Sequence, residues 1–284
     1  MPRGVPKSGF RNRSSIPSIK QYAFEDVVVV ESDAEIEEKL VDRFEILESM
    51  TEAAISGDVR ALIVSGPPGL GKSYTVEKAL TKWDADGANH KIIKGYVKAP
   101  ALYKALYAHR MPGQVLVFDD ADEVFLDDTS ISLLKAACDS SKKRNISYLT
   151  EGTLIDEEST ERMPKSFLFE GTVIFVTNYD FDAMIERGSK LAPHLQALVS
   201  RAHYIDMAMK TKRDYMIRIK QVIRQGLLDN VGLSVEGKTD VVKFIDDNQD
   251  RLRELSLRMA LKIGSIRKRG SNWMKVVRVT CCKS

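Results

Sequence analysis

A glycine-rich segment at residues 66–73 constrains the fold of this chain more than any other feature. It follows an apolar run at residues 61–64, which predicts a buried strand, and it precedes a helical pattern. Two glycines separated by four residues, followed by Lys and Ser, allow backbone N–H groups to surround phosphates at the N-terminus of a helix. We expect Lys72 to reach the β- and γ-phosphates and Ser73 to offer its hydroxyl to Mg²⁺. The expected nucleotide-binding residues are Gly66, Pro67, Pro68, Gly69, Leu70, Gly71, Lys72, Ser73 and Tyr74.

A second apolar run, at residues 115–118, ends in a pair of carboxylates. Asp119 and Asp120 follow it directly and lie about 47 residues beyond Lys72. We interpret Asp119 as a Mg²⁺ ligand, directly or through water, and Asp120 as the base that orients an attacking water. Acids at a strand end are common in turns and caps, but their pairing with the glycine-rich segment favours a catalytic role. The expected reaction is the hydrolysis of ATP.

Apolar runs and helical patterns alternate along most of the chain, which predicts an α/β fold with a parallel sheet and helices on both faces. The expected strands lie near residues 61–64, 91–97, 115–118 and 172–177, and the expected helices near 33–56, 101–108 and 131–142. The segment 144–171 predicts two short strands joined by a solvated loop. Beyond residue 205 the patterns are helical, near 211–228, 237–248 and 251–268. The predicted domains are a basic disordered arm (1–25), a nucleotide-binding core (26–208) and a helical lid with a basic C-terminal tail (209–284).

These motifs and their order resemble those of the AAA+ ATPases, from about residue 35 to 268. The resemblance implies a Walker A motif at 66–73 and a Walker B motif at 115–120. The family's Walker B motif usually ends in Asp-Glu, whereas this one ends in Asp119-Asp120. The shorter side chain of Asp120 places its carboxylate further from the water, which favours slow turnover. The wider sequence through Asp122 is similar to the Asp-Glu-Ala-Asp of clamp loaders and helicase-like relatives.

Three further matches follow in the family's order, and the resemblance gives each a role. Asn178, at the end of a predicted strand, resembles the sensor 1 residue that helps to place the attacking water. Arg201, in Ser-Arg-Ala, resembles the Ser-Arg-Cys arginine of clamp loaders, which reaches the γ-phosphate of a neighbouring subunit. Arg258 resembles sensor 2, an arginine that touches the nucleotide from the lid. The segment 164–178 also resembles AAA+ proteins encoded by phages and plasmids.

The resemblance and the charge distribution together suggest the partners. The family implies a homo-oligomer, a ring or partial ring such as a hexamer. The net charge of +3 hides basic ends, with +5 in residues 1–20 and +7 in residues 261–284, leaving −9 for the rest. Basic ends of this kind can bind the phosphates of nucleic acid, although they can equally be solvated tails. We therefore expect a role in DNA replication, recombination or helicase and clamp loading.

Two alternatives to a DNA-linked motor stay open. A remodeller or unfoldase of a protein client is favoured if Tyr96, or the segment 144–171, lines a central pore. A non-hydrolysing nucleotide-dependent scaffold is favoured by Asp120 in place of Glu.

No apolar run approaches the length of a membrane helix, and the N-terminus has no secretory pattern. The three cysteines and four histidines form no spacing typical of a metal site, so we expect reduced thiols and a cytoplasmic protein with no membrane partner.

Overall fold

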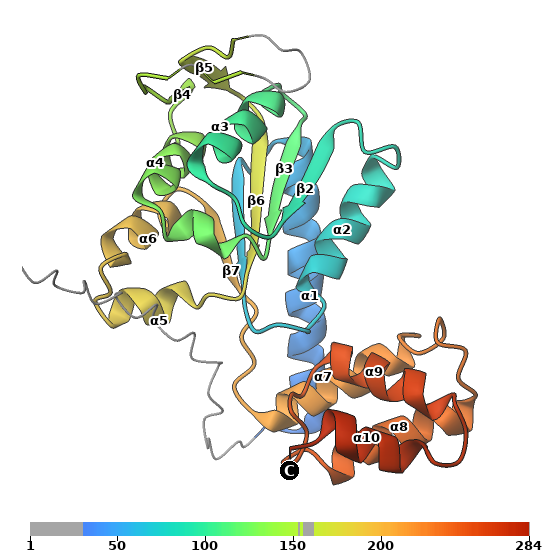
Figure 1. Cartoon of the computed structure of the whole chain (residues 1–284). Helices are drawn as coiled ribbons and strands as arrows, with labels where there is room; N and C mark the ends of the chain where they lie inside the picture. The colour runs from blue at the N-terminus through green and yellow to red at the C-terminus, as the bar shows by residue number, and fades with distance from the viewer. Residues whose placement is uncertain (1–30, 153, 156–161, 284) are drawn as a thin grey trace, which may run out of the picture.

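The computed structural model describes residues 31–152, 154–155 and 162–283, which form a sheet covered by helices and a helical domain below it (Figure 1). The five strands lie in the order β2-β3-β6-β1-β7, and every neighbouring pair is parallel. Their bounds are β1 Ala61–Ser65, β2 His90–Lys94, β3 Val115–Asp119, β6 Thr172–Thr177 and β7 His203–Asp206. The predicted α/β fold with a parallel sheet is confirmed.

Alternation along the buried strands divides the core between the two faces of the sheet. In β1, Leu62 and Val64 belong to the cluster that includes helices α1 and α2, while Ala61 and Ile63 belong to the cluster on the opposite face. Side chains two apart on a strand share a face, so one strand serves both clusters. The helices on the α1 face are α1 Asp33–Ser56 and α2 Lys72–Trp83, and those on the other face are α3 Ala99–Ala108, α4 Asp128–Ala137, α5 Phe181–Glu186 and α6 Ala192–Val199.

Local capping and turn chemistry explains where several elements begin and end. Helix α1 begins after Ser32, whose hydroxyl accepts from the Glu35 N–H in a capping box, at the residue expected from the sequence. Strand β2 ends at Lys94, short of the predicted residue 97, because Gly95 has φ of +89° and turns the chain away. Helix α4 begins at residue 128 rather than 131, because the carboxylate of Asp127 accepts from the Ser130 N–H.

The two short strands expected in the segment 144–171 are present as an antiparallel hairpin at the top of Figure 1. They are β4 Arg144–Ser147 and β5 Ser166–Phe169. A short 3-10 helix, η1 Asp122–Phe125, follows β3 and was not expected from the sequence. The acidic loop residues 156–161 and the basic arm 1–25 lie outside the described residues.

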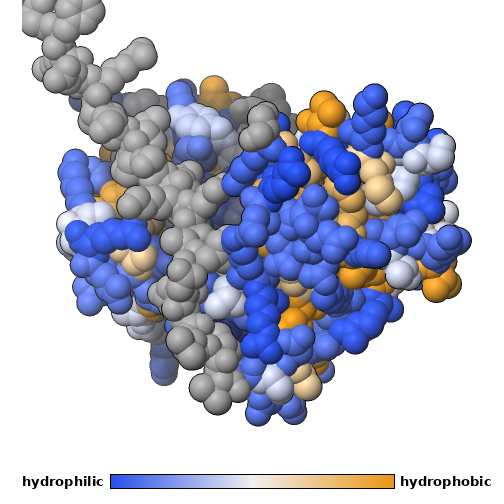
Figure 2. Space-filling view, turned by 90° about the horizontal axis from the view of Figure 1, so that it is seen from below, coloured by the Kyte–Doolittle hydropathy of each residue, from blue (hydrophilic) through white to orange (hydrophobic). Residues whose placement is uncertain are grey.

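The helical domain consists of four helices and shares a hydrophobic core with the α1 face of the sheet. Buried residues of α1 and of all four helices belong to one cluster, so the domain is docked on α1 and not merely tethered to it. The helices are α7 Lys212–Arg224, α8 Val235–Asp247, α9 Leu257–Arg267 and α10 Trp273–Cys281. Seen from below, the molecule is largely hydrophilic, with hydrophobic groups scattered among the polar ones (Figure 2).

The C-terminal segment is a packed helix, which corrects the expectation of a basic tail. Trp273, Val277 and Cys281 of α10 are buried against the other helices, and Leu252 pairs with Cys282 in an isolated bridge. Its neighbour α9 also starts later than the predicted residue 251, because Ser256 caps it. Within the described residues, no helix has both the length and the apolar character needed to cross a membrane.

Candidate nucleotide site

The C-terminal ends of β1, β3 and β6 meet at one edge of the sheet and bring the expected phosphate-site residues together. Strand β6 lies between β3 and β1, with Val176 beside Asp119 and Thr177 beside Ser65. The glycine-rich segment follows β1, the acidic pair lies at the end of β3, and Asn178 follows β6. Residues that are far apart in the sequence therefore face one another across this edge.

Lys72 is the first residue of α2, and its ammonium group is enclosed by oxygen atoms. Lys72 Nζ donates to Gly66 O at 2.6 Å, to Pro67 O at 2.8 Å and to Asn178 Oδ1 at 3.2 Å. The residue is only 5% exposed. Burial lowers the pKa of Lys72 to about 8, although the neighbouring carboxylates of Asp120, Asp119 and Asp122 act in the opposite direction. At neutral pH the site thus holds a buried cation at the N-terminus of a helix, where anions are favoured.

Ser73 and Asp119 present two oxygen atoms that fit a Mg²⁺ ion. Ser73 Oγ donates to Asp119 Oδ1 at 2.7 Å, and Asp119 Oδ2 lies 3.3 Å from Lys94 Nζ. Mg²⁺ prefers hard oxygen ligands and usually takes one or two from the protein and the rest from phosphates and water. The described residues contain no cluster of three or more acidic, His or Cys side chains that could hold a metal, and a phosphate-bound Mg²⁺ does not need one.

Asp120 is turned towards Asn178 by an unusual backbone conformation. Its φ is +54°, in the left-handed region that residues other than glycine rarely adopt, and its N–H donates to Val176 O at 3.0 Å. Asn178 Nδ2 donates to Asp120 Oδ1 at 2.6 Å, while the other amide atom of Asn178 accepts from Lys72. The structure thus brings Asp120, Asn178 and Lys72 into one hydrogen-bonded chain. Backbone strain retained at such a place is typical of functional sites.

Asp122 supports this edge from the first turn of η1. Thr177 Oγ1 donates to Asp122 Oδ1 at 2.5 Å, which ties the end of β6 to the turn after β3. Burial raises the pKa of Asp122 to about 6, with a smaller contribution from the neighbouring Asp120. The carboxyl therefore titrates just below neutral pH while it is held by the Thr177 hydroxyl.

The glycine-rich segment also touches the helical domain directly. Leu257 N–H, at the start of α9, donates to Gly69 O at 2.8 Å. Gly69 has φ of +75°, and a Cβ built on it would lie 2.6 Å from Ser256 Cβ, so a side chain is excluded there. Arg258 follows in the first turn of α9 and is exposed, and its charge contributes to lowering the pKa of Lys72. The candidate sensor 2 residue thus lies beside the phosphate loop.

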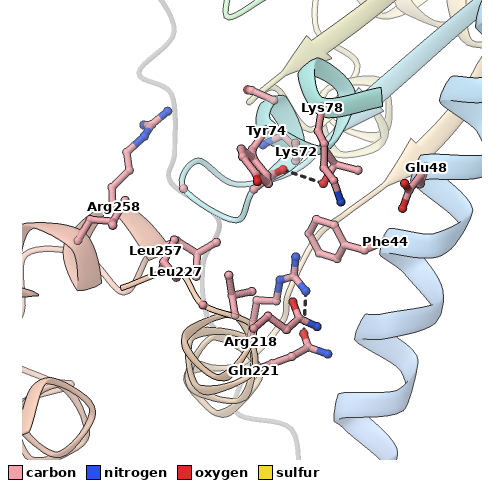
Figure 3. Close-up of a pocket in the computed structure, with 18 of the residues that line it drawn as sticks. Phe44, Glu48, Lys72, Tyr74, Lys78, Arg218, Gln221, Leu227, Leu257 and Arg258 are labelled. Atoms are coloured by element: carbon pink, nitrogen blue, oxygen red, sulfur yellow. Dashed lines mark hydrogen bonds between the residues drawn. The ribbon is translucent and has the colours of Figure 1, made fainter. Parts of the chain in front are cut away.

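A cleft of about 710 Å³ opens from the glycine-rich segment between α1, α2, α7 and α9 (Figure 3). Its volume lies within the range usual for small-molecule sites, on the order of 300–1,000 Å³. Tyr74 is an exposed residue on this cleft. The residues labelled along the cleft in Figure 3 are Phe44, Glu48, Lys72, Tyr74, Lys78, Arg218, Gln221, Leu227, Leu257 and Arg258.

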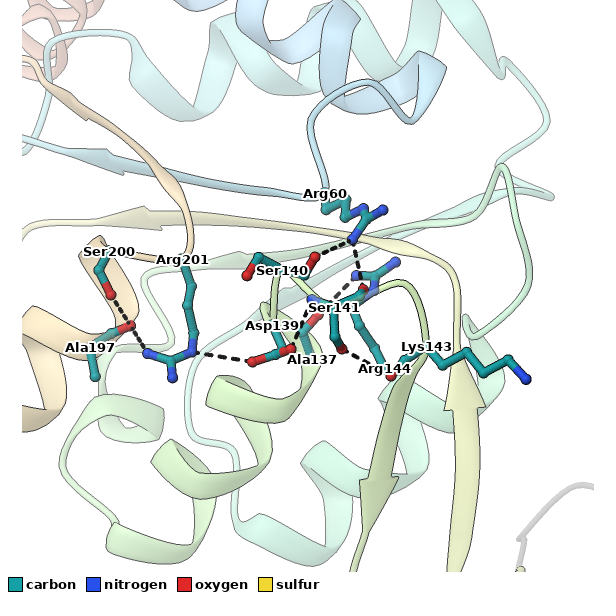
Figure 4. A network of polar contacts seen from close by, with 10 residues as sticks. All are labelled: Arg60, Ala137, Asp139, Ser140, Ser141, Lys143, Arg144, Ala197, Ser200 and Arg201. Carbon is teal, nitrogen blue, oxygen red and sulfur yellow. Dashed lines mark hydrogen bonds and ion pairs between the residues drawn. The ribbon is translucent and has the colours of Figure 1, made fainter.

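Arg201 does not join the phosphate-site residues of its own chain. It follows α6, and its guanidinium donates to Ala197 O at 2.7 Å and lies 3.6 Å from Asp139 Oδ2 (Figure 4). Among the described residues, no hydrogen bond or ion pair connects it to Lys72 or Asp120. Nearby, Arg60 and Arg144 donate to main-chain carbonyls at the end of α4, so Arg201 belongs to a separate polar network.

Sequence reasoning did not identify Lys94, Phe44 or Arg218 as residues of this site. Lys94 ends β2 and lies beside Asp119 in the register of β2 with β3. Knowing that these two strands are neighbours in the sheet would have revealed this pairing. Phe44 lies on the buried face of α1 and Arg218 on α7, where each matches the pattern of an ordinary helix. Only the tertiary packing brings these two residues together, and no pattern in the sequence indicates it.

Comparison with known proteins identifies one curated relative. The chain is 39% identical over 235 residues to an uncharacterized 36.7 kDa protein of Enterobacteria phage T4, from the nrdC-mobD intergenic region. The match covers 82% of this chain and 71% of the phage protein. No family model matches the chain.

Solved structures of similar fold have low identity to the chain. RuvB of Thermotoga maritima is 16% identical with a TM-score of 0.46, covering 87% of this chain and 64% of RuvB. NtrX of Brucella abortus, in complex with ATP, is 14% identical with a TM-score of 0.42, covering 87% of this chain. The chain spans about half (51%) of the NtrX length. The parallel sheet and the placement of the phosphate-site residues at one of its edges define the fold.

Proposed function

We propose that this chain, which belongs to the same family as the phage T4 protein, is a P-loop protein of the AAA+ type that binds ATP with Mg²⁺ and hydrolyses it. The observation that carries the proposal is the convergence of Lys72, Ser73, Asp119, Asp120 and Asn178 at one edge of the sheet. A phosphate loop, a pair of Mg²⁺-suited oxygens and a carboxylate held by an amide are the parts that phosphoryl transfer to water requires.

Some of these residues bind ATP in the ground state, and others act only in the transition state of hydrolysis. Lys72 and the N–H groups of the glycine-rich segment bind the phosphates, and Ser73 with Asp119 would hold Mg²⁺, which neutralises charge on the phosphate oxygens when bound. Asp120 orients the attacking water and accepts its proton, with Asn178 fixing the carboxylate. Because Asp120 is shorter than the usual Glu, we expect slow turnover.

Phosphate release from ATP in the presence of Mg²⁺ tests the proposal. Lys72→Ala is expected to abolish tight binding and turnover together, because it removes the buried cation. Lys82→Ala on the same helix is the matched control, since its side chain is 72% exposed and outside the cleft. Equal turnover by the Lys72 variant and the control would contradict the proposal.

We further propose that the active form is a homo-oligomer, a ring or partial ring, in which Arg201 acts on the site of the neighbouring subunit. The support is that Arg201 stays apart from the phosphate site of its own chain while being held within reach of solvent by Asp139. An arginine supplied in trans is worth roughly 10³–10⁵ in rate. Mixing Arg201→Ala with Lys72→Ala subunits should restore activity that neither has alone. Turnover by wild-type protein that is independent of its concentration, with no complementation in the mixture, would overturn this proposal.

For the client we propose DNA, in replication, recombination or helicase and clamp loading. The arm that carries +5 lies outside the described residues, and the basic C-terminal segment is a packed helix. Arg267 is paired with Asp240, whereas no ion pair within the described residues involves Lys268, Arg269, Lys275 or Arg278. These four charges are the structural support for a phosphate-backbone contact.

A protein remodeller is the second candidate, because Tyr96 is 69% exposed on the turn after β2. ATP turnover measured alone, with single-stranded DNA, with duplex DNA and with an unfolded protein separates the two. Stimulation by DNA that falls steeply with salt supports the DNA client, and stimulation by unfolded protein alone contradicts it.

A further inference from the structure

Arg218 of α7 is a buried arginine without a carboxylate partner. It is 7% exposed, and no ion pair involves it within the described part of the chain. Burial lowers the pKa of its guanidinium to about 10. Placing an unpaired charge out of water costs free energy, so such a group is rarely retained for packing alone.

Two neighbours hold the guanidinium of Arg218 in place, and one of its buried N–H donors has no hydrogen-bond partner. Arg218 Cζ lies 3.4 Å from the centre of the Phe44 ring, and Nη1 donates to Gln221 Oε1 at 2.7 Å. Nε is buried and has no hydrogen-bond partner. A guanidinium carries donors and no acceptors, so the group that satisfies this side chain must be a hydrogen-bond acceptor.

The orphaned side chain faces the nucleotide cleft beside the phosphate loop (Figure 3). A Cβ built on Gly71 would lie 3.7 Å from Arg218 Nη2 and 3.9 Å from a ring carbon of Phe44. Lys72 and the backbone N–H groups occupy the phosphate end of the cleft. Arg218 instead lines the cleft from α7, and Leu227 lines it from the turn after that helix. With phosphates on the loop, the base and the ribose of a nucleotide must lie in the remainder of this cleft.

We propose that Arg218, held by Phe44 and Gln221, is a base-contacting residue that donates a hydrogen bond to an acceptor atom of the nucleobase. The proposal rests on the proposed nucleotide site and names the residue that recognises the base there. A guanidinium stacked on an aromatic ring offers a planar, rigid surface suited to a planar heterocycle, which a lysine could not offer. A nucleobase carries the acceptor atoms that a guanidinium donor requires.

Binding of two ligands to three proteins tests the proposal. The ligands are ATP and inorganic tripolyphosphate, each with Mg²⁺, and the proteins are wild type, Arg218→Met and Arg224→Met. Arg224 is the matched control, because it lies on the same helix, 63% exposed and paired with Glu37. Since a hydrogen bond from a charged group is involved, we expect Arg218→Met to weaken ATP binding about 10- to 100-fold and to leave tripolyphosphate binding nearly unchanged.

The thermal midpoint without nucleotide separates ligand contact from packing. We expect Arg218→Met to melt no lower than wild type, because it removes an unpaired buried charge and keeps an apolar side chain on Phe44. A lower midpoint with unchanged ATP affinity would show a structural role and overturn the proposal. Equal loss of both ligands would assign Arg218 to the phosphates and overturn it too.

Two further results keep the test decisive. If Arg218→Met does not fold, Arg218→Lys takes its place, with the same selective loss of ATP affinity expected. If wild type binds neither ligand, the proposed function fails. If wild type and Arg218→Met bind ATP equally well, the nucleotide site stands and only the proposed role of Arg218 fails.

Discussion

Replacing Lys72 by Met should change how the stability of the nucleotide-free protein depends on pH. Burial lowers the pKa of Lys72 from 10.5 to about 8. Because each pH unit between these two pKa values corresponds to ~1.4 kcal/mol, keeping this charge at neutral pH costs the folded protein about 3.5 kcal/mol. Between pH 8 and 10.5 the unfolded chain retains the proton while the folded chain releases it. Stability contributed by Lys72 therefore rises with pH through this window and is lost as pH falls through 8.

The measurement is urea unfolding of wild type and Lys72→Met at several values between pH 7 and 10. Relative to that of the variant, the free energy of unfolding of wild type should rise by about 2.5 kcal/mol between pH 7 and 10, because the Met side chain has no proton to release. Lys82→Met is the control and should follow the wild-type curve. If wild type and Lys72→Met change in parallel with pH, the buried-cation account of this site is wrong.

Two other substitutions probe the edge of the site. Gly69→Ala should lower the free energy of unfolding by more than Gly87→Ala. Both glycines have positive φ, but only a Cβ built on Gly69 meets a neighbouring atom, Ser256 Cβ, at 2.6 Å. Equal losses of the free energy of unfolding, measured with urea, would rule out the clash. Asp122→Asn should gain stability relative to wild type as pH rises from 4 to 6, because the unfolded wild-type chain ionises at Asp122 in this window while the folded protein, with its raised pKa, keeps the proton. A stability difference that stays constant with pH in urea unfolding would refute that sign.

The phosphate end of the site could be predicted from the sequence because its chemistry is local. Glycines, a lysine and a hydroxyl must follow one strand in a fixed order, and Asp119 and Asp120 must follow another. The strand ends then meet because a parallel sheet aligns its carboxyl edges. The alternation of apolar runs likewise predicted the sheet itself.

The remaining features depend on contacts that the sequence pattern does not contain. Arg218 meets Phe44 only because α7 docks on α1, and neither residue departs from its helical pattern. Strand β7, with just four residues and an exposed His203, lacks the apolar run of a buried strand. The C-terminal segment was expected to be a tail because of its basic residues, yet Trp273 and Val277 make it a packed helix.

Asp120→Asn tests most directly whether this edge of the sheet hydrolyses ATP. Bound ATP and released phosphate are measured on the same protein samples, for wild type and for the variant. We expect the variant to bind ATP as tightly as wild type and to lose turnover, because Asp120 acts on the attacking water while Lys72 and the glycine-rich segment bind the phosphates. Turnover at the wild-type rate by Asp120→Asn would contradict this expectation.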